Sequence, residues 1–416
     1  MSHSLADIST ASPIRTAAEA GAYIASVCFK HGPPRRIGIE LEWLLTDPDD
    51  PLRHPDLPLL RTALGPHAPR TLNPDSPARP LPAGGLVTVE PGGQVEISSA
   101  PATSCSALIE KMRRDVERLD QLLRPTGFRL SGRAADAGRS GRRILHTPRY
   151  DAMATGFARI SPAGAVMMCA TAATQICVDL GRPDQAPLRW RAAHLLGPVL
   201  LAAFANSPAD GHVSARMAAW WALDPVRTEP PGSLELDDYV RRALDTPVLA
   251  RQRPAGDWLV PSPVRLRDWL AAGEPLATHD LDLHLSMLFP PVRPQGYLEL
   301  RYLDAQPEGE WLVPLALIAA LFGDPVALAE AAEACRPAAD RWRQATEVGL
   351  ADPLLAAAAR ELADIGDRVL GDLRLSPADL ELVRPVLRRR LRDGISPAAQ
   401  ARNQTAVVPE AEGVAG

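Results

Sequence analysis

The sequence predicts an α+β fold in which strands come early in the chain and helices come late. Three short runs, at residues 36–43, 94–98 and 297–302, alternate apolar with charged or polar side chains, which is the period-two pattern of a β-strand. Longer segments place apolar residues three and four positions apart, as amphipathic helices do, and helical segments dominate the chain after residue 312. We therefore expect one α+β domain with a helical C-terminal part.

Composition narrows the class of protein. With 416 residues and 46% hydrophobic content, the chain can bury a sizeable core, and a net charge of −5 gives no electrostatic basis for binding nucleic acid or an anionic membrane. The start of the chain lacks the pattern of a signal peptide, and the apolar stretch at 195–204 is too short to span a bilayer. We expect a soluble, cytoplasmic protein, and the sequence does not indicate its oligomeric state.

The cysteines favour the same compartment. They show no C-x-x-C spacing and no Cys/His zinc pattern, so reduced thiols in the cytoplasm are the expected state. The five are Cys28, Cys105, Cys169, Cys177 and Cys335.

The first half of the chain alternates regular elements with turns. Residues 16–29 predict an amphipathic helix, and residues 48–82 are so rich in proline that we expect a long surface loop without regular structure. Pro91-Gly92-Gly93 predicts a turn just before the second strand-like run. A helix over 104–123 is predicted by one apolar stripe, formed by Leu108, Met112, Val116, Leu119 and Leu123.

The second half reads as a strand followed by helices. Residues 166–180 are expected to form a long strand with Thr171, Gln175 and Asp179 on one face, and residues 188–204 a buried helix. Residues 312–321 predict a further helix. The segment Ser376-Pro377-Ala378-Asp379 has a capping residue, a proline at the first helical position and an acid at the third, so a helix begins there and ends at Gly394. Residues 397–416 are expected to be a disordered tail.

The three strand-like runs place acidic residues opposite their apolar residues. The first run presents Glu40 and Glu42, the second Glu96, and the third Glu299 with Arg301. Four carboxylates and a guanidinium on one sheet surface have the composition of a Mg²⁺–nucleotide site. Taken singly, each run is more typical of the wet face of an amphipathic strand, so the spacing alone does not establish that the runs meet.

An ordered series of motifs resembles the glutamate–cysteine ligases, in particular the branch shared by plants and some bacteria. The series spans residues 35–322 and comprises Gly38 to Glu42, Val89 to Ser98, Pro148-Arg149-Tyr150, Met167-Met168 with Thr174 to Asp179, Phe204 to Pro208, Ser214-Ala215-Arg216 with Trp220, Asp224 and Arg227, Leu288-Phe289-Pro290, and Tyr297 to Arg301. The compact length and the form Gly-Ile-Glu-Leu-Glu are most similar to the bacterial members that feed ergothioneine biosynthesis.

The resemblance implies a fold and a domain organisation. The fold is like the catalytic domain of glutamine synthetase, with a curved, mainly antiparallel sheet that forms a funnel and helices packed outside it. In these terms residues 1–34 are a helical lead-in and residues 35–322 the catalytic domain. Residues 323–396 are the helical C-terminal part of the same domain, and residues 397–416 are the tail.

The resemblance also implies an activity. Glutamate, cysteine and ATP would be the substrates, and the γ-carboxylate of glutamate would join the cysteine amine through γ-glutamyl phosphate to give γ-glutamylcysteine. The implied Mg²⁺ ligands are Glu40, Glu42, Glu96 and Glu299. Alternative functions are a carboxylate–amine ligase with another amine acceptor, and a non-catalytic amino-acid or nucleotide sensor on the same fold.

Further roles are expected for five polar side chains. Arg301 and Arg216 are the candidate catalytic residues, with Arg301 placed to hold the transferring phosphate. Arg149, Tyr150 and Gln175 are candidate substrate-binding residues. For Arg301 the competing interpretation is a structural salt bridge in an acidic funnel, and for the other four a structural role is equally well supported. The five cysteines are expected to be packing residues, because an acyl phosphate makes a protein nucleophile unnecessary.

Overall fold

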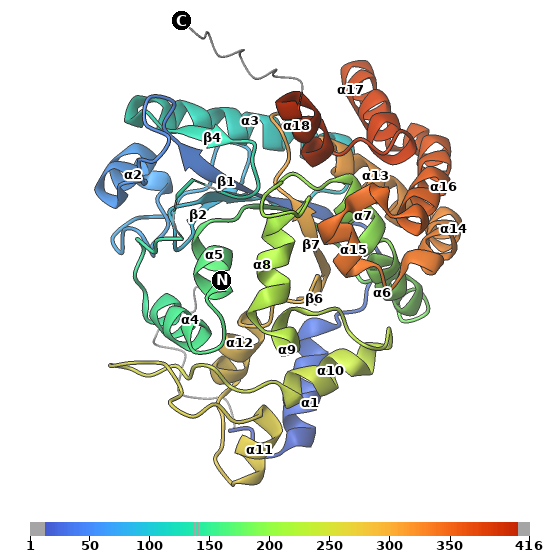
Figure 1. Ribbon diagram of the computed structural model, residues 1–416. Coiled ribbons are helices and arrows are strands. Elements are labelled where there is room, and N and C mark those ends of the chain that lie inside the picture. Colours follow the sequence, from blue (N-terminus) through green and yellow to red (C-terminus); the bar gives the residue numbers. More distant parts are fainter. Residues whose placement is uncertain (1–12, 137, 140, 407–416) are drawn as a thin grey trace, which may run out of the picture.

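The computed structural model describes residues 13–136, 138–139 and 141–406. A single antiparallel sheet lies at the centre, with helices on both faces and the C-terminal helices gathered to one side (Figure 1). The strand order is β2-β3-β1-β5-β7-β6, and β4 pairs with the far end of β1. The strands are β1 (Ile37–Thr46), β2 (Leu86–Val89), β3 (Val95–Ser98), β4 (Arg129–Ser131), β5 (Ala173–Val178), β6 (Val292–Pro294) and β7 (Leu298–Asp304). The α+β class with a helical C-terminal part is confirmed.

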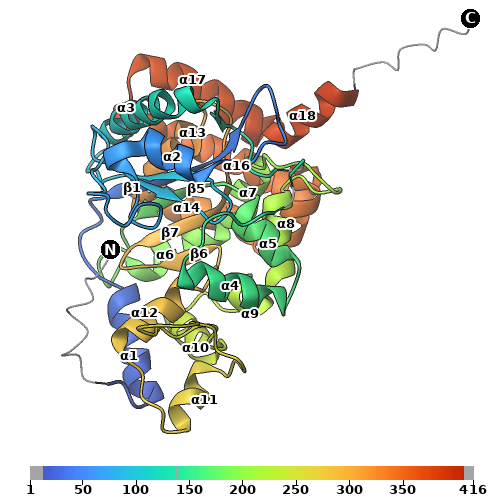
Figure 2. The same cartoon turned by 90° about the vertical axis from the view of Figure 1, so that its left-hand side faces the viewer.

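The helices surround this sheet. They are α1 (Ala17–Cys28), α2 (Leu57–Leu64), α3 (Cys105–Leu123), α4 (Pro148–Ala158), α5 (Ala163–Cys169), α6 (Ala186–Leu195), α7 (Gly197–Ala203), α8 (Ala215–Leu223), α9 (Pro225–Thr228), α10 (Leu236–Asp245), α11 (Leu266–Ala271), α12 (Thr278–Ser286), α13 (Leu312–Gly323), α14 (Pro325–Cys335), α15 (Trp342–Glu347), α16 (Pro353–Val369), α17 (Pro377–Leu387) and α18 (Pro397–Ala406). Helices α1, α10, α11 and α12 gather at one end of the molecule in both views (Figures 1 and 2).

Register brings the polar positions of the central strands onto one face of the sheet. The cross-strand pairs on this face are Glu42 with Glu96, Glu40 with Gln175, Cys177 with Glu299, and Arg293 with Glu299. The alternate positions, among them Ile39, Ile97 and Ile176, are buried in the hydrophobic core on the other face. Helices α3, α7 and α13 contact that side of the sheet. The alternation in the sequence therefore corresponds to one polar and one apolar face.

Several helices begin and end where the sequence predicts. Helix α1 starts at a capping box in which Thr16 accepts a hydrogen bond from the Glu19 N–H, and Glu19 accepts from the Thr16 N–H. Ser104 caps α3 and Ser376 caps α17. Helix α13 covers the predicted 312–321 and is buried almost throughout. These predictions are confirmed. They could be made from the sequence because a capping residue lies within a few residues of the helix end that it marks.

The proline-rich segment is more regular than expected, because it contains α2 and a 3-10 turn over Gly65–His67. Asp56 caps α2 by accepting a hydrogen bond from the Leu59 N–H, and Pro58 lies in the first helical turn, where proline is tolerated. Leu60 and Leu64 are fully buried. Two apolar anchors on one helical face thus outweigh the high proline content.

The expected long strand over residues 166–180 is wrong in its first half. Residues up to Cys169 belong to α5, and β5 begins only at Ala173. Thr171 lies between them and donates its hydroxyl hydrogen to the Met167 carbonyl, so it does not share a strand face with Gln175. The physical reason is that a short, mostly apolar run has no decisive periodicity, so its pattern does not distinguish helix from strand.

Two further boundaries differ from expectation. The helix predicted over 188–204 is two helices, α6 and α7, with a break before Gly197, where a Cβ would come within 2.0 Å of the Trp342 ring. The tail expected from residue 397 begins with α18, and Ala398 is buried and donates its N–H to the Ala205 carbonyl. Residues 407–416 of the expected tail, like residues 1–12 of the expected lead-in, lie outside the described residues.

In the described part of the chain, no single helix is long and apolar enough to cross a membrane. Two consecutive helical segments, Leu312–Gly323 and Pro325–Ala338, have the length and composition of a membrane span only when they are taken together, and the chain bends by 113° between them.

Candidate active site

A cavity of about 230 Å³ opens on the polar face of the sheet. Strands β1, β3, β5, β6 and β7 contribute its floor, and α4, α5 and α8 contribute its walls. Eight of the nine side chains to which the sequence analysis gave a site role line this cavity, namely Glu40, Glu42, Glu96, Arg149, Tyr150, Gln175, Arg216 and Arg301. The ninth, Glu299, is buried beside it and pairs with two arginines that line it.

Glu42 on β1 and Glu96 on β3 accept hydrogen bonds from neutral donors. Glu42 accepts hydrogen bonds from the Ala173 N–H at 2.9 Å and from the Gln175 amide at 2.7 Å. Glu96 accepts from the hydroxyls of Thr88 at 3.0 Å and Ser98 at 2.9 Å, both at the same oxygen. The other Glu96 oxygen accepts no hydrogen bond from a described residue, so it is available to a ligand.

Burial and mutual repulsion disfavour the charged forms of these acids. Burial raises the pKa of Glu96 to about 8, and the nearby Glu42 and Glu90 contribute to this rise. The pKa of Glu42 rises to about 7, chiefly through burial, with Arg216 opposing the rise. Burial, Glu96 and Glu299 raise the pKa of Glu40 well above its usual value. A bound cation would reverse these shifts.

Glu299 has different partners. Arg293 on β6 forms a bidentate pair with it, at 2.7 Å and 3.0 Å, and Arg301 donates to it at 2.6 Å. Although burial raises the pKa of Glu299, the two arginines lower it to a value below the usual range. Arg301 therefore does form a salt bridge, as its structural interpretation expected. Its Nε is nevertheless buried without a hydrogen-bond partner, and its side chain lines the cavity.

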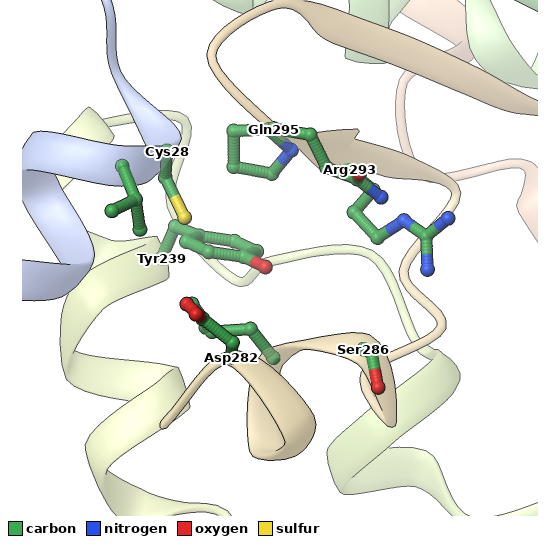
Figure 3. A pocket seen from close by; sticks show the side chains of 9 residues that line it. Cys28, Tyr239, Asp282, Ser286, Arg293 and Gln295 are labelled. Atoms are coloured by element: carbon green, nitrogen blue, oxygen red, sulfur yellow. The ribbon is translucent and has the colours of Figure 1, made fainter. Parts of the chain in front are cut away.

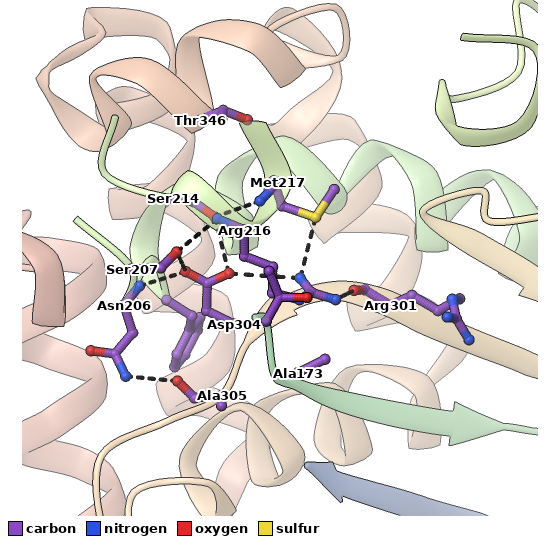
Figure 4. A network of polar contacts seen from close by, with 12 residues as sticks. Ala173, Asn206, Ser207, Ser214, Arg216, Met217, Arg301, Asp304, Ala305 and Thr346 are labelled. Atoms are coloured by element: carbon purple, nitrogen blue, oxygen red, sulfur yellow. Dashed lines mark hydrogen bonds and ion pairs between the residues drawn. The ribbon is translucent and has the colours of Figure 1, made fainter. Parts of the chain in front are cut away.

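Helices α4 and α8 supply the remaining candidates. At the start of α4, Arg149 donates to the Ser286 carbonyl at 3.0 Å, and the Tyr150 hydroxyl lies 3.4 Å from a Glu90 carboxylate oxygen. On α8, the guanidinium of Arg216 lies 4.9 Å from the Trp220 ring centroid, and that of Arg301 lies 5.3 Å from it. Arg216 also donates to the Arg301 carbonyl at 2.6 Å (Figure 4).

Sequence reasoning gave no site role to Glu90, Gln94 or Arg293, which also line the cavity. Glu90 could have been predicted, because the chain reverses at the Pro91-Gly92-Gly93 turn and Glu90 then lies on the same face of the sheet as Glu96. Gln94 donates to the Met168 and Thr171 carbonyls and so connects this turn to the end of α5 and to the loop that follows it. Arg293 lies in a strand of three residues, too short to show alternation.

Arg293 also borders a second cavity, of about 240 Å³, on the side of α1, α10 and α12. Cys28, Tyr239 and Asp282 line it, and Figure 3 shows the Arg293 guanidinium pointing away from Cys28. Ser286 lies on its wall and contacts Arg149 of the first cavity. The two cavities are thus separated by Arg293 and by the contact between Arg149 and Ser286.

The side chains of the first cavity fit a hard cation by chemistry. In the described ranges no three acidic, histidine or cysteine side chains are close enough together to hold one ion as they stand. The candidate ligand atoms of Glu40, Glu42 and Glu96 are nonetheless carboxylate oxygens, which suit Mg²⁺. These three acids also have raised pKa values and form no ion pair with a described arginine or lysine, so a cation could serve as their partner. The Mg²⁺ assignment and its ligands stay predictions.

Solved structures share the fold. The chain superposes with a TM-score of 0.53 and 14% identity on a crystal structure of glutamate–cysteine ligase from Francisella tularensis in complex with AMP, covering 91% of this chain and 86% of that one. A bifunctional glutathione synthetase from Pasteurella multocida gives a TM-score of 0.54 at 14% identity, covering 94% and 52%. The expected glutamine synthetase-like fold, with an antiparallel sheet and surrounding helices, is confirmed.

Sequence comparison is more specific. The chain is 35% identical over 405 residues to the glutamate–cysteine ligase EgtA of Mycolicibacterium smegmatis, covering 92% of this chain and 90% of that protein. It is 36% identical over 373 residues to EgtA of Mycobacterium tuberculosis (strain ATCC 25618 / H37Rv), covering 85% and 84%. Residues 36–414 match the family model described as glutamate-cysteine ligase family 2. The chain belongs to glutamate-cysteine ligase family 2.

Proposed function

We propose that this protein is an ATP-dependent glutamate–cysteine ligase that makes γ-glutamylcysteine for ergothioneine biosynthesis in the cytoplasm. Family membership and the similarity to two EgtA proteins support the ligase activity. One structural observation carries the proposal: four acids and four arginines from distant parts of the chain line one cavity. The acids are Glu40, Glu42, Glu90 and Glu96, and the arginines are Arg149, Arg216, Arg293 and Arg301.

The proposed chemistry needs both signs of charge. A carboxylate is a poor acyl donor, so an oxygen of the glutamate γ-carboxylate first attacks the γ-phosphorus of ATP and ADP leaves. The cysteine amine then attacks the acyl carbon, phosphate leaves with the bonding electron pair, and the nitrogen loses a proton. The first step brings two anions together, and fixed arginines stabilise charge that is shared among phosphate and carboxylate oxygens.

The roles of the chain's own residues follow from their partners. Arg301 would hold the transferring phosphoryl group, because it keeps an unpartnered Nε and faces the cavity. Glu40, Glu42, Glu96 and Glu299 would hold Mg²⁺, which when bound would neutralise the phosphate oxygens. Glu299 can serve only if one of its arginine contacts loosens, since both of its oxygens accept from guanidinium groups here.

The test is release of ADP with substrates omitted in turn. We expect ADP release to depend on glutamate, and glutamate with cysteine to give a γ-linked dipeptide, identified by mass spectrometry and by its resistance to peptidases that require an α-amide. ADP release with cysteine alone, or an α-linked product, would reject the proposal. Turnover with another amine in place of cysteine would favour the alternative ligase, and ligand binding without ADP release would favour a sensor.

A further inference from the structure

Asp304, the last residue of β7, is fully buried behind the wall of the catalytic cavity. One of its oxygens accepts hydrogen bonds from the Asn206 N–H at 2.8 Å and the Ser207 hydroxyl at 2.7 Å. The other accepts from the Ser214 hydroxyl at 3.0 Å and lies 3.6 Å from Nη1 of Arg216 (Figure 4). Burial raises the pKa of Asp304, and Arg216 opposes that rise. The carboxylate therefore gathers donors from two segments of the chain, residues 206–207 and 214–216.

Two hydroxyl groups connect this carboxylate to the start of α8. Ser207 donates to Asp304 and accepts from the Arg216 N–H at 3.1 Å. Ser214, which caps α8, donates to Asp304 and accepts from the Met217 N–H at 3.3 Å. The first backbone N–H groups of α8 thus point, through one hydroxyl each, at a single anion, an arrangement that the helix dipole also favours. Asp304 fixes where α8 begins relative to β7.

The same anion fixes the guanidinium that α8 carries into the cavity. Arg216 is only 1% exposed, and its contacts are Asp304, the Arg301 carbonyl, the Met217 sulfur and the Trp220 ring. Asp304 is its ion-pair partner and does not line the cavity, whereas on the cavity side the positive charge of Arg216 acts on Glu42 and lowers the pKa of that carboxyl. A substrate carboxylate that enters between glutamates needs such a charge in a fixed place.

An amide of the same shape cannot replace Asp304 without a clash of donors. If its NH₂ took the place of the oxygen near Asn206, it would face a backbone N–H that cannot turn away. If the NH₂ took the other place, it would face Arg216, which has no acceptor. The serine hydroxyls can reverse their direction, but neither the Asn206 N–H nor Arg216 can. The site thus specifies a carboxylate, and an amide would displace either the loop at Asn206 or the guanidinium.

We propose that Asp304 is a positioning residue for glutamate, acting through Ser207, Ser214 and Arg216. The inference rests on the proposed function, since it takes the ligand held by Arg216 to be a carboxylate of the glutamate substrate. Glutamate is the amino-acid substrate with two carboxylates, and a guanidinium in a fixed place suits such a group. Asp304 itself touches no substrate.

The decisive variant is Asp304→Asn, and the chain offers a matched control. Asp224 forms a similar pair with Arg227, at 3.0 Å, and Arg227 is also 1% exposed, but neither residue lines the catalytic cavity. We expect Asp304→Asn to lower kcat/KM for glutamate by about 10- to 100-fold, the size associated with one charged hydrogen-bonded contact, while the KM for ATP changes little. Asp224→Asn should lose stability and keep near-normal kinetics per folded molecule.

A milder variant keeps the test usable if Asp304→Asn does not fold. Ser207→Ala removes one donor to Asp304 and one acceptor for the Arg216 N–H, so it should shift the same glutamate parameter in the same direction by less. Equal kinetics for either Asp304→Asn or Ser207→Ala and wild type would overturn the proposal. So would equal losses for ATP and glutamate, because a merely structural role affects both.

Calorimetric titration of glutamate, without cysteine, tests the role of Asp304 separately from the proposed ligase function. We expect wild type to bind glutamate at least about 10-fold more tightly than Asp304→Asn, and Asp224→Asn to match wild type. Lack of ADP release by wild type would reject the proposed function alone, provided that this difference in affinity persists. Equal affinity of wild type and Asp304→Asn, or no binding to either, would reject the role of Asp304.

Discussion

Glu299 is neutralised by two guanidinium groups, whereas Glu40, Glu42 and Glu96 have no ion pair with a described arginine or lysine. This difference gives the two groups of acids different tasks before ligands arrive. The unpaired acids have raised pKa values, so they are oxygen ligands that would lose their protons when a cation binds. Glu299 instead holds Arg301 in a defined place. The Nε of Arg301 has no partner there, so it could donate to the phosphate of the proposed substrate. If ATP binds as proposed, an exchange of partners at Glu299 would accompany its binding.

Arg301→Lys tests this at the level of one side chain. Lysine keeps the charge, and Arg293 can still pair with Glu299, so the fold should survive. A compact ammonium cannot hold two phosphate oxygens as a planar fork does, and small misplacements can cost on the order of 100-fold in rate. We expect turnover to fall by roughly that factor in steady-state assays. Near-normal turnover would show that Arg301 is a structural salt bridge.

The raised pKa of Glu96 has a consequence for stability. A carboxyl with a pKa of about 8 in the folded protein and an ordinary value in the unfolded chain keeps its proton longer when folded. The folded state then binds more protons between about pH 4.5 and pH 8, so the free energy of unfolding falls as pH rises through this window, by on the order of 1 kcal/mol per pH unit.

Glu96→Gln should remove that contribution. We expect the metal-free variant to lose less stability than wild type between pH 5 and pH 8, as measured by denaturant unfolding, while ligase activity collapses. The exposed Glu110, changed to Gln, is the control and should follow wild type. A wild-type slope in Glu96→Gln would show that Glu96 ionises normally in the folded protein.

Among the elements, the turn between β2 and β3 is tightly constrained by close packing. A Cβ on Gly92 would come within 2.1 Å of the Cys169 carbonyl oxygen, and Gly93 has a φ of +87°, in the left-handed region. The turn therefore presses directly against the end of α5. Because Glu90 and Glu96 flank this turn, its position sets the spacing of two cavity acids.

Gly92→Ala is expected to destabilise the protein by about 1–3 kcal/mol, because the clash is with backbone and the turn or α5 must move. The shift should also lower turnover per folded molecule, since Glu90 and Glu96 move with it. Gly32→Ala is the control, because a methyl group at that position would meet no atom within 4 Å. Thermal unfolding and kinetics on both variants check this, and equal behaviour would contradict it.

Elements with a local signal were predictable and those set by distant contacts were not. The strands around Glu40, Glu96 and Glu299 show period-two alternation, which is a property of the segment itself. Helix α2 depends on two buried leucines that no local pattern singles out in a proline-rich segment. The inclusion of Arg293 in the site depends on the register of β6 against β7, which is a property of the assembled sheet.

For the molecule as a whole, the thiols are part of the packing. Burial raises the pKa values of Cys28, Cys105, Cys169 and Cys335 to about 12, so these thiols stay protonated. Cys177 is partly buried beside Glu40 and Glu299, and burial raises its pKa well above the usual value.

A variant with all five cysteines changed to Ser or Ala should lose stability before it loses turnover per folded molecule. Melting temperature and active-site-normalised rates would show this, with single substitutions as controls. Trapping of a thioester on any of the five, by rapid acid quench and mass spectrometry, would contradict the acyl-phosphate route.

The strand order also determines when the active site can form during biosynthesis. Strand β1 lies in the middle of the sheet, yet Glu40 and Glu299 are separated by more than half the chain's length. During translation, the acids of β1 and β3 emerge from the ribosome long before Arg293 and Arg301. Pairing between strands that are this far apart in the sequence is also slow. A nascent chain halted before β6 therefore carries an acidic sheet face without half of its arginines, and we expect no ligase activity until β7 has emerged and docked against β5.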